Sequence, residues 1–324
     1  MAVIRTLLFA FAFCLLPTAA WAQVEVPPPV SGRAGDALQL SDAMARARLL
    51  GAHLDRLRRH MGRAAPEPSI LRVRRAAPRE VIFAAGNLGR RVAELEFELL
   101  RRKTPWRFDP PAQVEARHLV DSVTRVLKVI MAIESHFGLE VELQEVAVED
   151  GVLAADLMNV LIEMGALVDD LLEQPPTISE GFMYITFAGN LALDLHRVLT
   201  DEMMPEPPPL VPEQTVKEVF MKLIDCTERT RAVFDRLNVP VVEFEINEAV
   251  LDRVEIDTFS NLISILIAEL LWLSKRVPGT RPPIDPYAVG SKLPSDLVQR
   301  AGLLEAVLQD IAEAEGLGPE SIAR

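Results

Sequence analysis

The sequence SDAM at residues 41–44 opens a stretch that passes a Pro-Glu-Pro break and reaches PREV at residues 78–81. About 138 residues later this order returns, because SEGF at residues 179–182 leads through Pro-Glu-Pro to VKEV at residues 216–219. Self-similarity at a fixed offset predicts a duplicated architecture. The matched positions include Gly51 with Gly189, Leu57 with Leu195, and Leu99 with Leu237.

Apolar residues recur at steps of three and four, as in Val81, Ala85, Leu88, Val92 and Leu95. This spacing keeps one apolar seam along a helix. Prolines and small polar residues interrupt the periodic runs at positions typical of helix starts and stops. The pattern predicts eight helices, over residues 41–62, 78–102, 112–137, 149–173, 179–201, 213–237, 255–276 and 294–315.

We therefore predict an all-α fold of eight long antiparallel helices, arranged as two duplicated up-and-down four-helix bundles. A short helical solenoid is the weaker alternative. Residues 70–73, 140–143 and 241–246 alternate apolar and polar side chains, so we expect short extended connectors there. The expected parts are a signal peptide (1–22), a flexible N-terminal segment (23–40), a first lobe (41–174), a second lobe (175–316) and a C-terminal tail (317–324).

The first residues have the layout of a secretory signal. Arg5 precedes an apolar run from Leu7 to Leu16, and the tripeptide Ala20-Trp21-Ala22 follows. An apolar run of about ten residues is too short to span a bilayer, and small residues at this distance are typical of a cleavage site. We expect cleavage after Ala22 and a periplasmic or secreted protein, with an uncleaved anchor as the alternative.

Cleavage would remove Cys14 and leave Cys226 as the only cysteine, which excludes a disulfide within the chain. Cys226 lies on an apolar helix stripe and is expected to be a buried small hydrophobe. The net charge of −13 disfavours a nucleic-acid partner, which calls for a basic surface. It also provides no attraction to anionic lipid.

The residues that could support catalysis do not form a known motif. His53 and His60 lie about 10 Å apart on one helical face, too far to share a metal ion. The acidic connector 140–150 lacks the calcium-loop pattern. Covalent haem, serine-hydrolase, phosphate-loop and zinc-protease signatures do not occur in the sequence. We therefore predict no metal, no cofactor and no catalytic residue.

The third helix of each half is apolar on more than one face. Such a helix has to be covered on more than one side, so we expect it to pack against the other half or against a second chain. The candidate partner-binding residues are Val123 and Ile130 in the first of these helices, and Leu266 and Trp272 in the second.

Gly51 and Gly189 occupy matched positions in the middle of two predicted helices, where glycine costs up to about 1 kcal/mol relative to alanine. One interpretation is close approach of two helices. The other is an apolar ligand pocket within each bundle. Phe83, Phe97, Met183, Tyr184 and Phe187 are the candidate lining residues of such a pocket.

These observations favour an exported, non-catalytic helical binding or scaffold protein that recognises another protein or a second copy of itself. The alternative is a ligand-binding or sensory helical bundle with an apolar pocket near Gly51 and Gly189.

Overall fold

The periodic segments form α-helices in the computed structural model, and the described residues confirm an all-α fold. The structure describes residues 38–66, 69–102, 104–106, 110–111, 113–139, 147, 149–173, 176–247, 251, 254, 256–284, 287 and 290–322. The predicted signal peptide, most of segment 23–40 and the expected connector 140–143 lie outside these residues.

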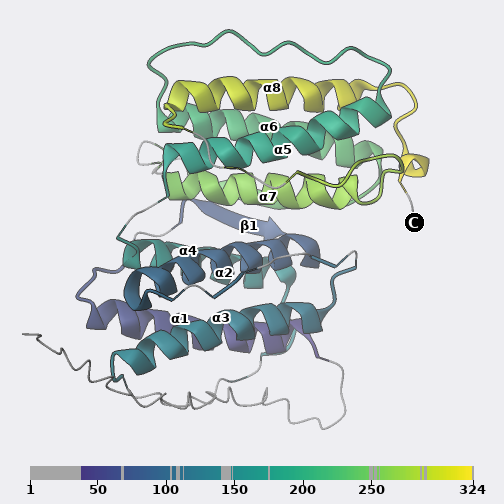
Figure 1. Ribbon diagram of the computed structural model, residues 1–324. Coiled ribbons are helices and arrows are strands. Elements are labelled where there is room, and N and C mark those ends of the chain that lie inside the picture. Colours follow the sequence, from purple (N-terminus) through teal and green to yellow (C-terminus); the bar gives the residue numbers. More distant parts are fainter. Residues whose placement is uncertain are drawn as a thin grey trace, which may run out of the picture.

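Each predicted helix is present with its ends shifted by a few residues (Figure 1). The helices are α1 (Leu40–His60), α2 (Pro78–Leu100), α3 (Ala116–His136), α4 (Ala154–Leu171), α5 (Ile178–Leu199), α6 (Val216–Arg236), α7 (Ile256–Ser274) and α8 (Pro294–Glu313). A short 3₁₀-helix, η2 (Pro319–Ser321), follows α8.

Local sequence explains several helix starts. At α5, the Thr177 side chain accepts a hydrogen bond from the Glu180 backbone N–H at 3.2 Å. The Glu180 carboxylate in turn accepts one from the Thr177 backbone N–H at 2.8 Å. Thr215 and Glu218 form the same reciprocal pair at the start of α6. Such a capping box satisfies backbone donors that the first helical turn leaves without partners.

The helices pack in two groups with the same pattern of neighbours. In the N-terminal group (α1–α4), α1 and α2 each contact α3 and α4. In the C-terminal group (α5–α8), α5 and α6 each contact α7 and α8. Figure 1 shows one group above the other. The apolar stripes of all eight helices meet in a core of buried side chains.

The helices of the C-terminal group run parallel to one another, so the expected up-and-down antiparallel order is wrong. The carboxyl-terminal ends of α5 and α8 meet where His196 lies 3.3 Å from Asp310. The ends of α6 and α7 meet where the Phe234 and Trp272 ring centroids lie 5.7 Å apart. Residues just before α6 also reach the first turn of α8, since the Gln214 N–H donates to Ser295 Oγ at 3.1 Å.

The N-terminal group is parallel as well. His53 near the end of α1 contacts Glu134 near the end of α3, and Arg91 of α2 pairs with Asp169 near the end of α4. The connector after α2 turns back along that helix: Thr104 bonds Glu96, and Pro110 shares a cavity wall with Phe83, so α3 starts beside the start of α2.

The length of the connectors explains why the helices within each group run parallel. The connectors inside each group hold 15 to 19 residues, whereas only six separate α4 from α5. A helix of about 20 residues is about 30 Å long, and an extended chain of 15 residues reaches about 50 Å. Each connector can therefore return along the full length of a helix and start the next one in the same direction.

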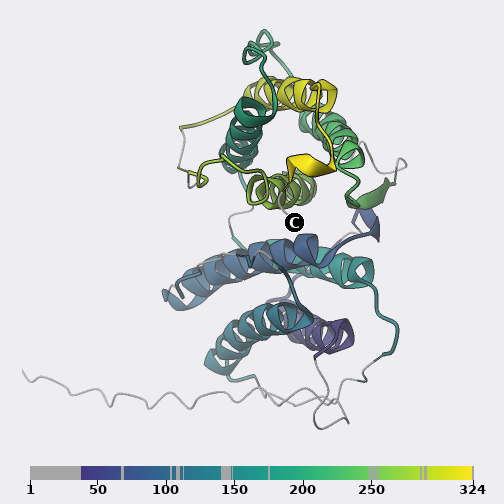
Figure 2. The same cartoon turned by 90° about the vertical axis from the view of Figure 1, so that its right-hand side faces the viewer.

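The two groups meet through helices α2 and α7 and through the one sheet of the described residues (Figure 2). Strands β1 (Leu71–Arg75) and β2 (Glu243–Ile246) pair antiparallel, with Val73 opposite Phe244. This confirms extended structure at two of the predicted connectors. Asn159 of α4 holds β1 in place, because its side chain exchanges hydrogen bonds of 2.8 and 2.9 Å with the Val73 backbone.

Candidate ligand-binding site

A cavity of about 680 Å³ lies where the two helix groups meet. Helices α2, α4, α5 and α7 form its walls, together with Trp106 and Pro110 of the connector after α2. Apolar surface predominates in the lining. A cavity of this size and character falls in the range of small-molecule sites in proteins.

The cavity-lining residues of each helix are spaced mostly three or four positions apart, so they lie on one face of the helix. This face lies beside the face that packs in the core. The core face of α2 holds Val81, Ala85, Leu88 and Val92. Its cavity stripe is Phe83, Asn87, Arg90 and Glu94; that of α5 is Glu180, Met183, Tyr184 and Phe187; that of α7 is Ser260, Ser264, Ile267 and Leu271.

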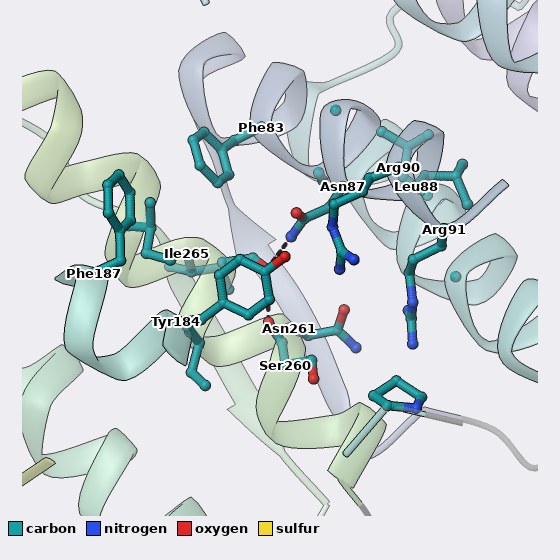
Figure 3. Close-up of a pocket in the computed structure, with 18 of the residues that line it drawn as sticks. Phe83, Asn87, Leu88, Arg90, Arg91, Tyr184, Phe187, Ser260, Asn261 and Ile265 are labelled. Atoms are coloured by element: carbon teal, nitrogen blue, oxygen red, sulfur yellow. Dashed lines mark hydrogen bonds between the residues drawn. The ribbon is translucent and has the colours of Figure 1, made fainter. Parts of the chain in front are cut away.

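The cavity has an apolar end and a polar end (Figure 3). Phe83, Phe187 and Ile265 gather at one end. The side chains of Arg90, Arg91 and Asn261 lie at the other. This arrangement suits a molecule with a hydrophobic body and a polar head.

The two arginines are held by acidic partners from within the chain. Arg90 bonds Glu94 one turn further along α2 at 2.6 Å, and its guanidinium lies over the Tyr184 ring, 5.2 Å from the centroid. Arg91 is buried and forms an ion pair with Asp169 of α4. The positive charges at this end are thus matched, so hydrogen bonding rather than net charge would select the head of a ligand.

Three buried N–H donors of cavity-lining side chains lack a hydrogen-bond partner among the described residues. They are Arg90 Nε, Trp106 Nε1 and Arg91 Nη2, and only the last faces a carboxylate, that of Asp169. A buried donor without an acceptor costs about 1–3 kcal/mol. Arg90 and Trp106 line the cavity, so a small shift of either side chain would let a ligand oxygen recover that cost, and the site favours a head that accepts hydrogen bonds.

Other polar groups bridge the two helix groups or face the cavity. The Asn87 side chain of α2 donates to the Ser264 hydroxyl of α7. Burial raises the pKa of the Tyr184 phenol above its ordinary value of 10. Tyr184 therefore stays protonated at neutral pH and presents a neutral O–H.

Gly89 positions Trp106 at this site. The Trp106 ring lies where a Cβ atom at Gly89 would be, so a side chain there would displace the ring. Arg125 of α3 covers the ring at 4.2 Å from its centroid and donates to the Pro105 carbonyl at 2.6 Å. The connector is thereby fastened between α2 and α3.

The structure brings together four of the seven predicted ligand residues. Phe83, Met183, Tyr184 and Phe187 line the cavity, whereas Gly51, Phe97 and Gly189 do not. The cavity lies between the helix groups, not inside each one. No neighbouring atom lies within 4 Å of where a Cβ would stand at Gly51 or Gly189, so neither glycine marks a close helix contact.

The four predicted partner residues lie largely inside the chain. Val123 and Ile130 of α3 and Leu266 of α7 are buried. Trp272 is half-buried between two guanidinium groups, with Arg79 at 4.7 Å and Arg276 at 4.6 Å from its ring. Helix α7 packs against α2 of the other group, whereas α3 packs on α1 and α2 of its own group.

Sequence reasoning missed Asn87, Arg90, Arg91 and Asn261. A signal was present, because Phe83, Asn87 and Arg90 recur with helical spacing beside the core stripe of α2. Nothing in that spacing indicated that an α5 stripe about 90 residues later would face it.

Cys226 is the free cysteine of the described part of the chain. Cys226 is buried, burial raises the pKa of its thiol, and its Sγ donates to the Ala301 carbonyl at 3.4 Å. No three His, Cys, Asp or Glu side chains converge as metal ligands there. None of the described helices has the length and hydropathy of a membrane span.

No protein-family model, curated protein or solved structure matches the chain. Its function therefore has to be inferred from its own geometry.

Proposed function

We propose that this chain is a non-catalytic binding protein for a small amphipathic molecule, held between α2, α4, α5 and α7. The observation that carries the proposal is the 680 Å³ cavity with aromatic side chains at one end and arginine and asparagine side chains at the other. The unpartnered donors Arg90 Nε and Trp106 Nε1 favour a head with oxygen acceptors. The hydrophobic body packs against Phe83 and Phe187.

A matched pair of variants tests this proposal. Ala84 lines the cavity, and Ala84→Trp would fill much of it. Ala45 on α1 is also half-buried but does not line the cavity, so Ala45→Trp is the control. Binding is measured with an environment-sensitive fluorescent amphiphile. We expect Ala84→Trp to weaken binding at least tenfold and Ala45→Trp to leave it unchanged; equal affinities in both variants would overturn the proposal.

A second candidate function is recognition of another protein. It is supported by the connector between α5 and α6, where Met203 is 92% exposed and Met204, Leu210 and Val211 are also exposed. Figure 1 shows this connector running along the outside of the C-terminal group. Replacing all four residues with serine would abolish association with a protein partner or with a second copy, measured by light scattering and cross-linking. Self-association through α3 and α7 would instead require Val123, Ile130 and Leu266 to leave the core.

We also propose that the two helix groups descend from one duplicated four-helix unit, divided as 41–174 and 175–316. The equivalent neighbours of α1–α4 and α5–α8, and their shared parallel direction, support this. Export through the signal 1–22 to the periplasm or the exterior is a proposal from the sequence. Amino-terminal sequencing of the mature protein would find Gln23 first if Ala22 ends the signal.

A further inference from the structure

We infer that the ligand is a long single-chain amphiphile whose tail passes Phe187 and ends in a second cavity along α5. This inference rests on the proposed function of the main cavity and names the class of molecule that it takes.

The second cavity measures about 300 Å³ and adjoins the first. The two cavities share the wall residues Phe187 and Pro283. The second cavity is lined mainly by apolar surface, to which Leu191, Leu193 and Ile284 contribute. An apolar chain that fills the first cavity thus meets a further apolar space behind Phe187.

The two cavities lie in sequence along one helix. Tyr184 faces the polar end of the first cavity, Phe187 forms the shared wall, and Leu193 lines the second cavity. Nine residues from Tyr184 to Leu193 correspond to about 14 Å along the axis of α5. This order fits an elongated molecule better than a compact one.

Two charged side chains of the second cavity, Asp194 and Arg197, are bound within the chain. The Asp194 carboxylate accepts hydrogen bonds from Arg197 at 2.8 Å and from the Arg281 backbone N–H at 2.6 Å. Arg197 also donates to the Gly279 carbonyl at 2.8 Å. A hydrocarbon end fits this space better than a second polar head, which would compete with these bonds.

The exposed side chain of Ile284 independently supports a ligand tail that covers the second cavity. Its side chain is 70% exposed at the rim of the second cavity. Apolar surface gathered at a concave site marks a place where an apolar ligand gains free energy by excluding water. The tail would cover Ile284 together with Leu193.

The test uses two homologous series of straight-chain probes, carboxylates and alcohols, with the full-length protein and isothermal titration calorimetry. Each added methylene that is buried strengthens binding about fourfold. We expect this increase to continue beyond the chain length that fills the first cavity. The two series separate an anionic head from a neutral one.

Leu193→Trp fills the second cavity and is expected to weaken binding of the longest chains at least tenfold while leaving the shortest unchanged. Leu199→Trp is the matched control, because Leu199 is a half-buried residue of the same helix that lines neither cavity. Phe187→Ala shortens the shared wall and is expected to raise the affinity ratio of long to short chains. This second readout keeps the inference testable if Leu193→Trp folds poorly.

The outcomes separate the two proposals. If no amphiphile of either series binds, the proposed function fails and the inference fails with it. If short chains bind but longer ones gain nothing, and Leu193→Trp and Phe187→Ala leave the length dependence unchanged, the proposed function stands and the second cavity is not part of the site.

Discussion

The Arg90 guanidinium lies over the Tyr184 ring, 5.2 Å from its centroid, and this contact joins helices α2 and α5 at the polar end of the cavity. The two residues come from different helix groups, so the site exists only when the groups are packed together. A stacked guanidinium also keeps its N–H groups in a defined plane. The pair is therefore the first place to test ligand recognition.

Arg90→Met keeps most of the apolar stem but removes the donors and the charge. We expect affinity for an amphiphilic probe to fall by about tenfold or more, since hydrogen bonds to charged groups contribute about 1.5–3 kcal/mol. Tyr184→Phe keeps the ring and is expected to change affinity much less. Titration calorimetry compares the variants, and unaltered binding by Arg90→Met would mean that the head does not lie there.

Glycine substitutions should have opposite effects at two positions. A Cβ at Gly51 meets no atom within 4 Å, so Gly51→Ala should raise the free energy of unfolding by about 0.5–1 kcal/mol through helix propensity. A Cβ at Gly89 overlaps the Trp106 ring, so Gly89→Ala should lower it by about 1–3 kcal/mol. Urea denaturation measures both. Stabilisation by Gly89→Ala would show that the Trp106 connector moves aside at no cost.

The junction of α2 and α7 depends on the guanidinium of Arg79. Arg79 Nε lies 2.9 Å from a Glu269 oxygen, and the Glu80 carboxylate lies beside it. Burial and the nearby Glu269 raise the pKa of Glu80 well above its usual value, which shows the electrostatic strain of two buried acids. Removing the cation leaves both acids in the interior, so Arg79→Met should cost about 3–5 kcal/mol of unfolding free energy.

The control for Arg79 is an ion pair across the sheet. Arg74 of β1 and Glu245 of β2 are both about half-exposed. Arg74→Met should therefore change the unfolding free energy very little, because water screens the exposed pair. Hydrogen exchange should report faster opening of α2 and α7 in Arg79→Met alone; equal protection in both variants would contradict the role assigned to Arg79.

Acid should weaken the contact between α1 and α3. Burial raises the pKa of Glu134, but hydrogen bonds from His53 and Arg56 outweigh it and hold this pKa below its usual value of 4.5. A depressed carboxyl pKa stabilises the fold above the unfolded-state value, and this stability disappears as pH falls through the folded-state value. We expect the wild-type unfolding free energy to fall more steeply below about pH 5 than that of Glu134→Gln. Parallel pH profiles of the two proteins would contradict this expectation.

The elements that the sequence predicted are those with a local cause. The repeated three- and four-residue apolar steps predicted all eight helices, and residue alternation predicted extended connectors at 70–73 and 241–246, where the strands Leu71–Arg75 and Glu243–Ile246 lie. Phe83, Met183, Tyr184 and Phe187 line the cavity because they lie beside the core stripes of α2 and α5, on faces that another element covers. Arg90, Arg91 and Asn261 escaped notice because a polar residue on a helix is ordinarily solvated.

The sequence by itself determined the approximate span of each helix, which face of each is apolar, and that the chain is helical. Only the tertiary structure decided that the helices within each group run parallel and that α2 and α5 face one another across a cavity. The physical reason is that helical periodicity depends only on residues within a turn or two of one another, whereas packing depends on residues far apart in the sequence. A connector of 15 to 19 residues permits either helix direction, so the packing of distant faces makes that choice.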